Sequence, residues 1–149
     1  MTILNVFGEF LRTLELPGER GLDIPLILGY PDVGRIQPTL PLGALVFLSD
    51  DYARGSGGVG DTRPRIGQVQ PAGYQFGARL TLFARNEREL LSLIDRFRLL
   101  KAGGLNSLTV EGRQYTIRYG PTEREQFSPE EETIYNHAAS TPVWFIQAA

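Results

Sequence analysis

The sequence of 149 residues contains no cysteine and a single histidine, His137. The absence of cysteine excludes disulfides, thiolate chemistry and most structural zinc arrangements. Metal ligation or base catalysis by His137 would need partners at a suitable spacing, and its neighbours Asn136, Ala138 and Ala139 supply none. We therefore expect His137 to make a structural hydrogen bond on a strand.

Lysine is almost absent, because Lys101 is the only lysine among 15 basic residues. Arginine suits bidentate contacts across protein interfaces better than lysine, although genome base composition could produce the same bias. The net charge of -2 gives no global attraction to nucleic acid, so sequence-specific DNA or RNA binding is not expected.

Long apolar runs are also missing, and none approaches the ~20 residues that a membrane-spanning helix needs. The stretch from Met1 to Phe7 has neither the basic start nor the cleavage pattern of a signal peptide. We therefore expect no membrane contact and a cytoplasm-like compartment. The length and the 42% hydrophobic content predict one globular domain over residues 1–149.

The clearest structural pattern runs from Tyr74 to Leu100. Side chains alternate from Tyr74 to Arg85, which predicts a strand with one buried face that carries Tyr74, Phe76, Ala78, Leu80 and Leu82. A helix then begins with Asn86 as N-cap and Glu89 in the capping-box position. Its apolar stripe is predicted to comprise Leu90, Ile94 and Phe97, widened by Leu91, Leu93 and Leu100. Gly103 and Gly104 end it.

Weaker patterns supply the other elements. An amphipathic helix is predicted from the spacing of Ile3, Phe7, Phe10 and Leu14, with Leu4 and Leu11 beside them. The stretch from Pro25 to Gly43 is rich in proline and is expected to be extended, with at most one short strand. Further strands are predicted at Leu42–Ser49 and in a hairpin over 107–119 that turns at Glu111-Gly112. The closing strand runs from Thr133 to Ile146, with Pro142 at a break or an exposed edge.

Together these patterns predict an α+β fold. We expect a mixed, mainly antiparallel sheet covered by the amino-terminal and central helices, with a long Gly-rich hairpin loop between two strands. Residues 65–70 could pair with the strand that starts at Tyr74.

The Gly-rich loop matches two phosphate-binding patterns only superficially. Residues 55–60, GSGGVG, fit GxGxxG, but Asp61 stands where a P-loop needs lysine, and a strand-like run follows where a helix should start. A mobile hairpin loop is the preferred interpretation, and such a loop can order against a partner. Its candidate docking residues are Arg54, Gly55, Gly57, Gly58, Gly60, Arg63 and Arg65.

Other chemical motifs are no stronger. The run Glu130, Glu131 and Glu132 is a solvated acidic patch more readily than a metal site. Trp144 and Phe145 are expected to pack in the core or on a strand, since no basic groove accompanies them. No G-x-S-x-G nucleophile elbow is present. We therefore expect no enzymatic activity and no cofactor.

The order of elements resembles the tail terminator (minor tail protein U-like) family of long-tailed bacteriophages. The segments that carry the resemblance are Leu42–Asp50, Gly77–Arg85 running into Asn86–Leu100, and Tyr135–Ile146. The stretch from Pro25 to Pro41 does not map onto the family pattern.

The resemblance implies a structural virion protein that assembles in the host cytoplasm. Members form a hexameric ring at the head-proximal end of the tail tube, stop its polymerisation and offer a surface to the neck. Expected partners are further copies of the chain, the tail tube protein and neck or head-completion proteins, and the resemblance implies that DNA passes through the ring. A second interaction surface is expected in the acidic segment from Pro121, at Glu123, Arg124, Glu125, Glu130, Glu131 and Glu132.

Two other function classes stay open. One is a different neck or baseplate component of a phage or contractile injection system. The other is a small-molecule-binding or hydrolytic α+β domain, which would be a compact monomer with a deep pocket.

Overall fold

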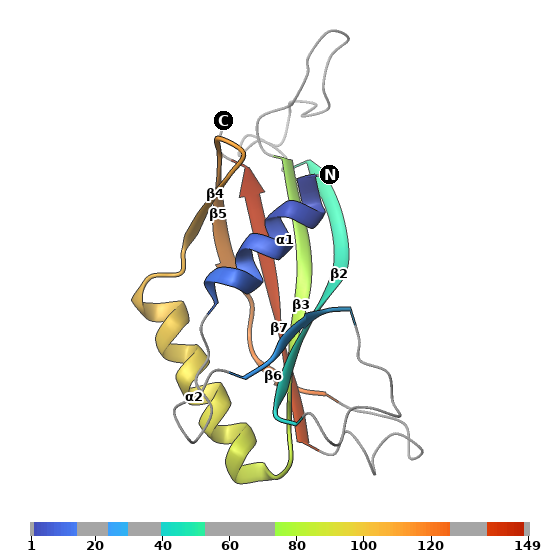
Figure 1. Ribbon diagram of the computed structural model, residues 1–149, viewed down its shortest axis with the longest axis vertical. Coiled ribbons are helices and arrows are strands. Elements are labelled where there is room, and N and C mark those ends of the chain that lie inside the picture. The colour runs from blue at the N-terminus through green and yellow to red at the C-terminus, as the bar shows by residue number, and fades with distance from the viewer. Residues whose placement is uncertain (1, 15–23, 30–39, 53–73, 126–136, 148–149) are drawn as a thin grey trace, which may run out of the picture.

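The computed structural model describes residues 2–14, 24–29, 40–52, 74–125 and 137–147. Within them the chain forms two helices and seven strands (Figure 1). The helices are α1 (Thr2–Thr13) and α2 (Glu87–Gly103). The strands are β1 (Leu26–Leu28), β2 (Leu42–Tyr52), β3 (Tyr74–Ala84), β4 (Ser107–Val110), β5 (Arg113–Tyr119), β6 (Glu123–Arg124) and β7 (His137–Gln147).

All seven strands belong to one sheet with the order β1-β2-β3-β7-β5-β4, and β6 also pairs with β7. The pairing of β1 with β2 is parallel, and every other pair is antiparallel. The predicted α+β class with a mixed, mainly antiparallel sheet is therefore confirmed. The Gly-rich hairpin loop and the strand expected at 65–70 lie outside the described residues.

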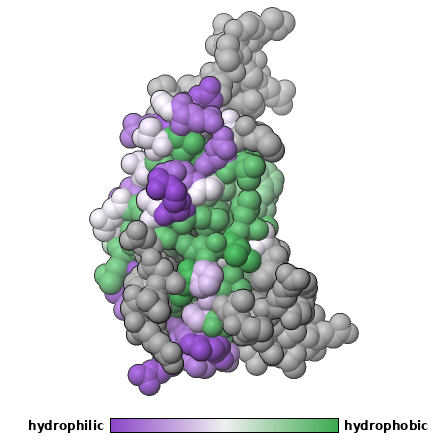
Figure 2. Space-filling view, viewed as in Figure 1, coloured by the Kyte–Doolittle hydropathy of each residue, from purple (hydrophilic) through white to green (hydrophobic). Residues whose placement is uncertain are grey.

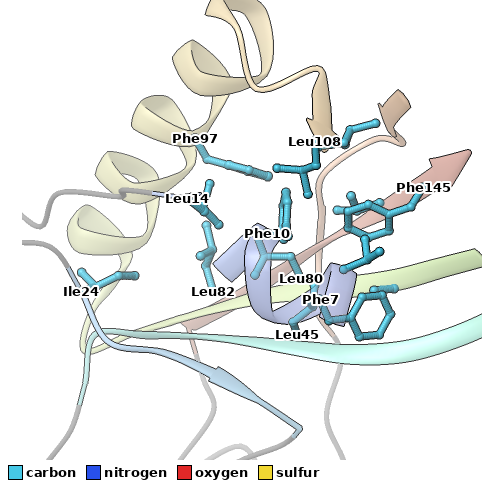
Figure 3. Close-up of a cluster of buried hydrophobic side chains, with 14 of the residues drawn as sticks. Phe7, Phe10, Leu14, Ile24, Leu45, Leu80, Leu82, Phe97, Leu108 and Phe145 are labelled. Atoms are coloured by element: carbon cyan, nitrogen blue, oxygen red, sulfur yellow. The ribbon is translucent and has the colours of Figure 1, made fainter. Parts of the chain in front are cut away.

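Both helices pack on the same face of the sheet, as predicted. Phe7 of α1 lies 5.7 Å from Phe76 of β3 and 5.6 Å from Phe145 of β7, measured between ring centroids. Phe97 of α2 belongs to the same buried cluster (Figure 3). We call this cluster the main core.

The helix stripes are turned slightly from their predicted phase. In α2 the buried apolar residues are Leu90, Leu93 and Phe97, which confirms the burial of Phe97. Ile94 is only partly buried, and Leu91 is 56% exposed, so its predicted place in the stripe is wrong. In α1 the same rotation buries Val6 and exposes Leu4.

Strand β3 is buried on both faces, where the alternation predicted one. Phe76, Ala78, Leu80 and Leu82 lie in the main core, as expected. Phe83 on the opposite face joins a second apolar cluster with Leu42, Ala44 and Ala138. Phe83 is covered by its cross-strand neighbours, because Leu42 of β2 and Ala138 of β7 stand beside it on that face, and Leu40 and Ile27 pack against the cluster.

Pro142 lies inside β7, which pairs with β3 on one side and with β5 and β6 on the other. The predicted break or exposed edge is therefore wrong. Since β5 ends at Tyr119 and β6 begins at Glu123, Pro142 faces the gap between them, where its carbonyl accepts a hydrogen bond from the Gly120 N–H at 2.8 Å. A strand residue directs its N–H and C=O to the same neighbour, so the donor that proline lacks would have pointed into this gap.

The hairpin of β4 and β5 is confirmed. Val110 pairs with Arg113, and the two turn residues between them have positive φ, 53° at Glu111 and 76° at Gly112. This is the conformation of a two-residue turn that matches the twist of the strands. The side chain of Asn5 in α1 donates a hydrogen bond to the Glu111 carboxylate, so the turn is also tied to the first helix.

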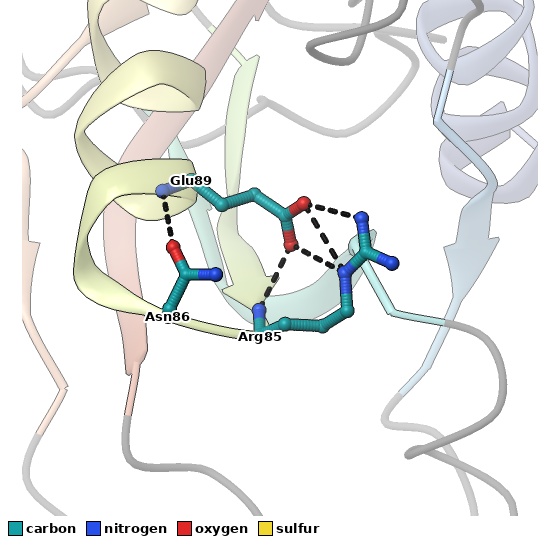
Figure 4. Close-up of polar contacts among 3 residues, drawn as sticks. All are labelled: Arg85, Asn86 and Glu89. Atoms are coloured by element: carbon teal, nitrogen blue, oxygen red, sulfur yellow. Dashed lines mark hydrogen bonds and ion pairs between the residues drawn. The ribbon is translucent and has the colours of Figure 1, made fainter.

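The predicted start of α2 is confirmed, with one difference in detail (Figure 4). The Asn86 side chain accepts a hydrogen bond from the Glu89 N–H at 2.9 Å. The Glu89 carboxylate reaches past the N-cap and accepts from the Arg85 N–H at 2.9 Å and from its Nη2 at 2.7 Å. A capping box would have used the N–H of Asn86. Here the carboxylate joins the end of β3 to the start of α2.

Two substitutions in α2 test the packing of the helix on the sheet. Phe97→Ala should lower the free energy of unfolding by about 3–5 kcal/mol, because it removes a fully buried ring. Leu91→Ala, on the exposed side of the same helix, should change it by no more than about 0.5 kcal/mol. Urea denaturation followed by circular dichroism measures both. Equal costs for the two variants would contradict the helix phase described here.

The Glu89 carboxylate predicts a pH dependence of stability. Burial opposes its ionisation, but the hydrogen bonds from Arg85 outweigh that effect and hold the pKa of Glu89 below its ordinary value of 4.5. A carboxyl group whose pKa is lowered by folding stabilises the fold above the unfolded pKa, and this contribution is lost as the pH falls through the folded pKa.

Glu89→Gln should therefore cost on the order of 1.5 kcal/mol at pH 7, a modest value because Arg85 is largely exposed. The difference from the wild type should shrink below pH 4.5. Asp95→Asn, at an exposed carboxylate of the same helix, is the control and should change stability little. A Glu89→Gln cost that is equal at pH 3 and pH 7 would refute the ion pair as its cause.

Candidate interaction surfaces

The first predicted docking element, from Arg54 to Arg65, lies outside the described residues. Its candidate residues therefore remain a prediction. The same holds for Glu130, Glu131 and Glu132 of the second predicted surface.

The described part of the second surface is built into the sheet. Glu123 pairs with Ser140 and Arg124 with Ala139, and the Glu125 N–H donates to the Ala138 carbonyl at 2.9 Å. The side chains of Glu123 and Arg124 stay exposed. This backbone pairing, which the acidic composition did not indicate, holds their exposed side chains beside β7.

Arg124 belongs to an intramolecular charge network at the start of α2. Its guanidinium donates to the Glu87 carboxylate, and His137 Nδ1 lies 3.3 Å from the other oxygen of Glu87. The hydrogen bonds from Arg124 and then from His137 lower the pKa of the Glu87 carboxyl group. The structural hydrogen bond predicted for His137 is thus confirmed. Arg124 therefore serves the fold as well as the surface.

Trp144 packs on a strand, as predicted. It faces away from the main core, where its neighbour Phe145 is fully buried. Its ring lies over Gly77 of β3, and a Cβ atom at Gly77 would come within 2.6 Å of the ring. Glycine at this position therefore makes room for the indole.

Two hollows flank the carboxyl-terminal half of α2. The first has a volume of about 440 Å³ and is lined mainly by apolar atoms of Arg96, Leu99, Leu100, Gly103, Gly104 and Leu105. We call it the α2 hollow. It forms because α2 ends at two glycines, which place no side chains between Leu99 and Leu105, and Gly104 takes a positive φ of 153°.

The second hollow is basic and lies between α2 and β5. It measures about 560 Å³, and Arg98, Lys101 and Arg118 contribute to its lining. The Lys101 ammonium sits 5.1 Å from the centre of the Phe97 ring and 3.2 Å from the Thr122 hydroxyl, and burial lowers its pKa. Burial also raises the pKa of Tyr119, whose hydroxyl donates to the Leu105 carbonyl at 2.7 Å. The contacts of Lys101 and Tyr119 therefore show a packing role between α2 and β5.

A strip of exposed apolar side chains lies on the helix-covered face, over β1 and β2. Leu28 pairs with Leu45 of the main core, and Phe47, two residues further along β2, pairs with Ala78 of that core. Both side chains therefore point to the side on which the helices pack. Phe47 is nevertheless 50% exposed.

Leu4 of α1 is also exposed, at 44%. Its side chain lies about 100° around the helix from that of Asn5, which bonds to the turn between β4 and β5. We call the two strand residues Leu28 and Phe47 the apolar ridge. Figure 2 shows a patch of apolar atoms beside α1 in this part of the face.

The sequence patterns located neither the ridge nor the α2 hollow. In both places an apolar side chain, Phe47 or Leu99, is left exposed because no helix or strand of the described residues packs over it. The structure has a β-bulge between Phe47 and Ser49. The continuous apolar run at this place in the sequence did not indicate this bulge. For the hollow, the paired glycines after α2 were visible, but only as a helix stop.

The described residues contain no group of three or more histidine, aspartate or glutamate side chains that could hold a metal ion. Within the same ranges, neither helix has the length and apolar character to cross a membrane. Comparison of the chain with protein-family models finds no match, and comparison with curated protein sequences finds none either.

Proposed function

We propose that this chain is a structural protein of a phage tail, which forms a ring at the head-proximal end of the tail tube. The ring would stop tube polymerisation and join the tail to the neck. The observation that carries the proposal is the order of elements on one sheet. A helix and two long strands precede the capped helix α2, and a hairpin and a long closing strand follow it. This is the order on which the resemblance to tail terminators rests.

The arrangement of the sheet supports a role in assembly. Strands β2, β3 and β7 each have 11 residues and lie side by side, so they form a stiff central wall. Both helices pack on one face of this wall, and exposed apolar and charged groups lie at its flanks. Each copy in a ring of identical subunits must offer two different surfaces in a fixed geometry, and a long sheet with such groups at both flanks suits that requirement.

The recognition expected of such a ring is of three kinds. Neighbouring copies would meet at the flanks of the sheet. The tail tube would meet loops at one end, for which the Gly-rich segment from Arg54 to Arg65 is the candidate. Neck or head-completion proteins would meet another surface, for which Glu123–Glu125 and Glu130–Glu132 are candidates. DNA would pass through the ring without sequence-specific contacts.

The quaternary structure tests this proposal. We expect the purified protein to form closed rings of uniform copy number, visible by negative-stain electron microscopy, with a matching mass by light scattering at high protein concentration. A compact monomer at every concentration, with a small molecule bound in a hollow, would instead favour the binding or hydrolytic class.

A deletion tests the Gly-rich segment. Removing Gly55–Gly60 should leave the melting temperature nearly unchanged, because loop length affects closure entropy only weakly. The same deletion should impair attachment of the protein to tail tubes, measured by co-sedimentation. Replacing residues 55–60 by a Gly/Ser stretch of equal length, which keeps the three arginines in place, is the matched control and should retain attachment. An unfolded deletion variant, or one that attaches normally, would show that the segment is not the docking element.

A further inference from the structure

The apolar ridge and the α2 hollow lie on opposite flanks of the molecule. Figure 1 places β2, which carries Phe47, on one side of the sheet and α2 on the other. One feature is an exposed side chain on a strand and the other is a recess that could receive such a side chain. They cannot meet within one copy of the chain.

Both features expose large apolar side chains to solvent, and burying these side chains against another surface would be favourable. Phe47 is 50% exposed and Leu99, at the rim of the α2 hollow, is 58% exposed. A hollow of about 440 Å³ with a mainly apolar lining has room for an aromatic side chain. Burying a ring such as that of Phe47 is among the largest single contributions that an interface residue makes.

The charges around the two features are also complementary. Strand β2 continues from Phe47 to Asp50, which is exposed and accepts a hydrogen bond from the Tyr74 hydroxyl at 3.1 Å. Asp50 pairs with Phe76 of the main core, so it lies on the same face of the sheet as Phe47. Of the basic residues in the carboxyl-terminal half of α2, Arg96 lines the hollow. Arg98 pairs with Asp95, and Lys101 packs on Phe97 at the second hollow. Opposite charges facing each other steer association and fix the register of two surfaces.

We propose that Phe47 of one copy of this chain packs into the α2 hollow of the next copy, with Asp50 facing Arg96 at the rim of that hollow. The contact is heterologous, since the two partners contribute different surfaces. Repeated around an axis, a contact of this kind closes into a ring. The inference therefore rests on the proposed function and specifies the subunit interface of that ring.

The absence of cysteine makes a crosslinking test clean. Two variants, Phe47→Cys and Leu99→Cys, replace exposed side chains and should fold normally. One of them carries a size tag, and the two are mixed under mild oxidation and separated on a non-reducing gel. The mixture should give the disulfide-linked heterodimer in at least ten-fold greater yield than either variant gives of its own homodimer.

A matched control replaces Phe47→Cys by Gln114→Cys. Gln114 is exposed on β5 and faces away from the helices, because its neighbour Tyr115 lies in the main core. This control measures random collision with Leu99→Cys. The double variant Phe47→Cys/Leu99→Cys should give a ladder of oligomers that stops at the copy number of the ring.

Two results would overturn the interface. One is a heterodimer yield no higher than that of the Gln114→Cys control. The other is a Phe47→Cys homodimer that forms as fast as the heterodimer, which would indicate an isologous contact.

The test also separates this inference from the proposed function. Wild-type rings seen by microscopy without the Phe47–Leu99 crosslink would overturn the interface and leave the terminator proposal standing. Specific heterodimers that extend into open chains, with no effect on tail tubes, would support the contact and overturn the terminator proposal.

Discussion

The fold depends on a group of aromatic rings centred on Phe76 in the middle of the sheet. The Phe76 ring lies 5.7 Å from Phe7, 5.5 Å from Phe145 and 5.9 Å from Tyr115, between ring centroids. These contacts join α1, β3, β7 and β5, which are far apart in the sequence. Rings at such distances stabilise each other beyond the burial of their area. These contacts fix the position of α1 on the sheet. The position of α1 in turn determines where the turn between β4 and β5 is tied to it and which part of β2 stays uncovered.

The second determinant is the junction of β3 and α2. The Glu89 carboxylate bonds to Arg85 at the end of the strand, while Asn86 caps the helix. The direction of α2 is thereby fixed within one turn of its start. Phe97 then anchors the helix in the main core, 5.7 Å from the ring of Tyr119. The position of the α2 hollow follows from these contacts, since the hollow forms where this helix ends.

Local patterns in the sequence predicted much of this architecture. The cap at Asn86, the stop at Gly104 and the turn at Glu111-Gly112 are each determined by a few adjacent residues, and all three are confirmed. The predictions were wrong where contacts between segments distant in sequence determine whether a residue is paired or buried. Pro142 is tolerated inside a central strand because the gap between β5 and β6 lies on the side to which its missing N–H would have pointed. Phe83 is buried because Leu42 and Ala138, on the strands to either side, pack against it on the same face of the sheet.

The interaction surfaces were harder to predict for the same reason. A local pattern can mark an apolar residue, but whether that residue is covered depends on segments remote in sequence. The exposure of Phe47 follows from the limited reach of α1 and β1 across the sheet. The charged segment at Glu123 and Arg124 illustrates the converse, since its composition indicated an exposed surface and its pairing with β7 also made it part of the sheet.

The proposed role of this chain is to end a tail tube. The most direct measurement is the length distribution of tubes assembled from the cognate tail tube protein with and without this chain, recorded by electron microscopy. Tubes incubated with the protein should stop growing and carry a ring at one end only. Tubes that continue to lengthen at both ends in the presence of excess protein would contradict this role.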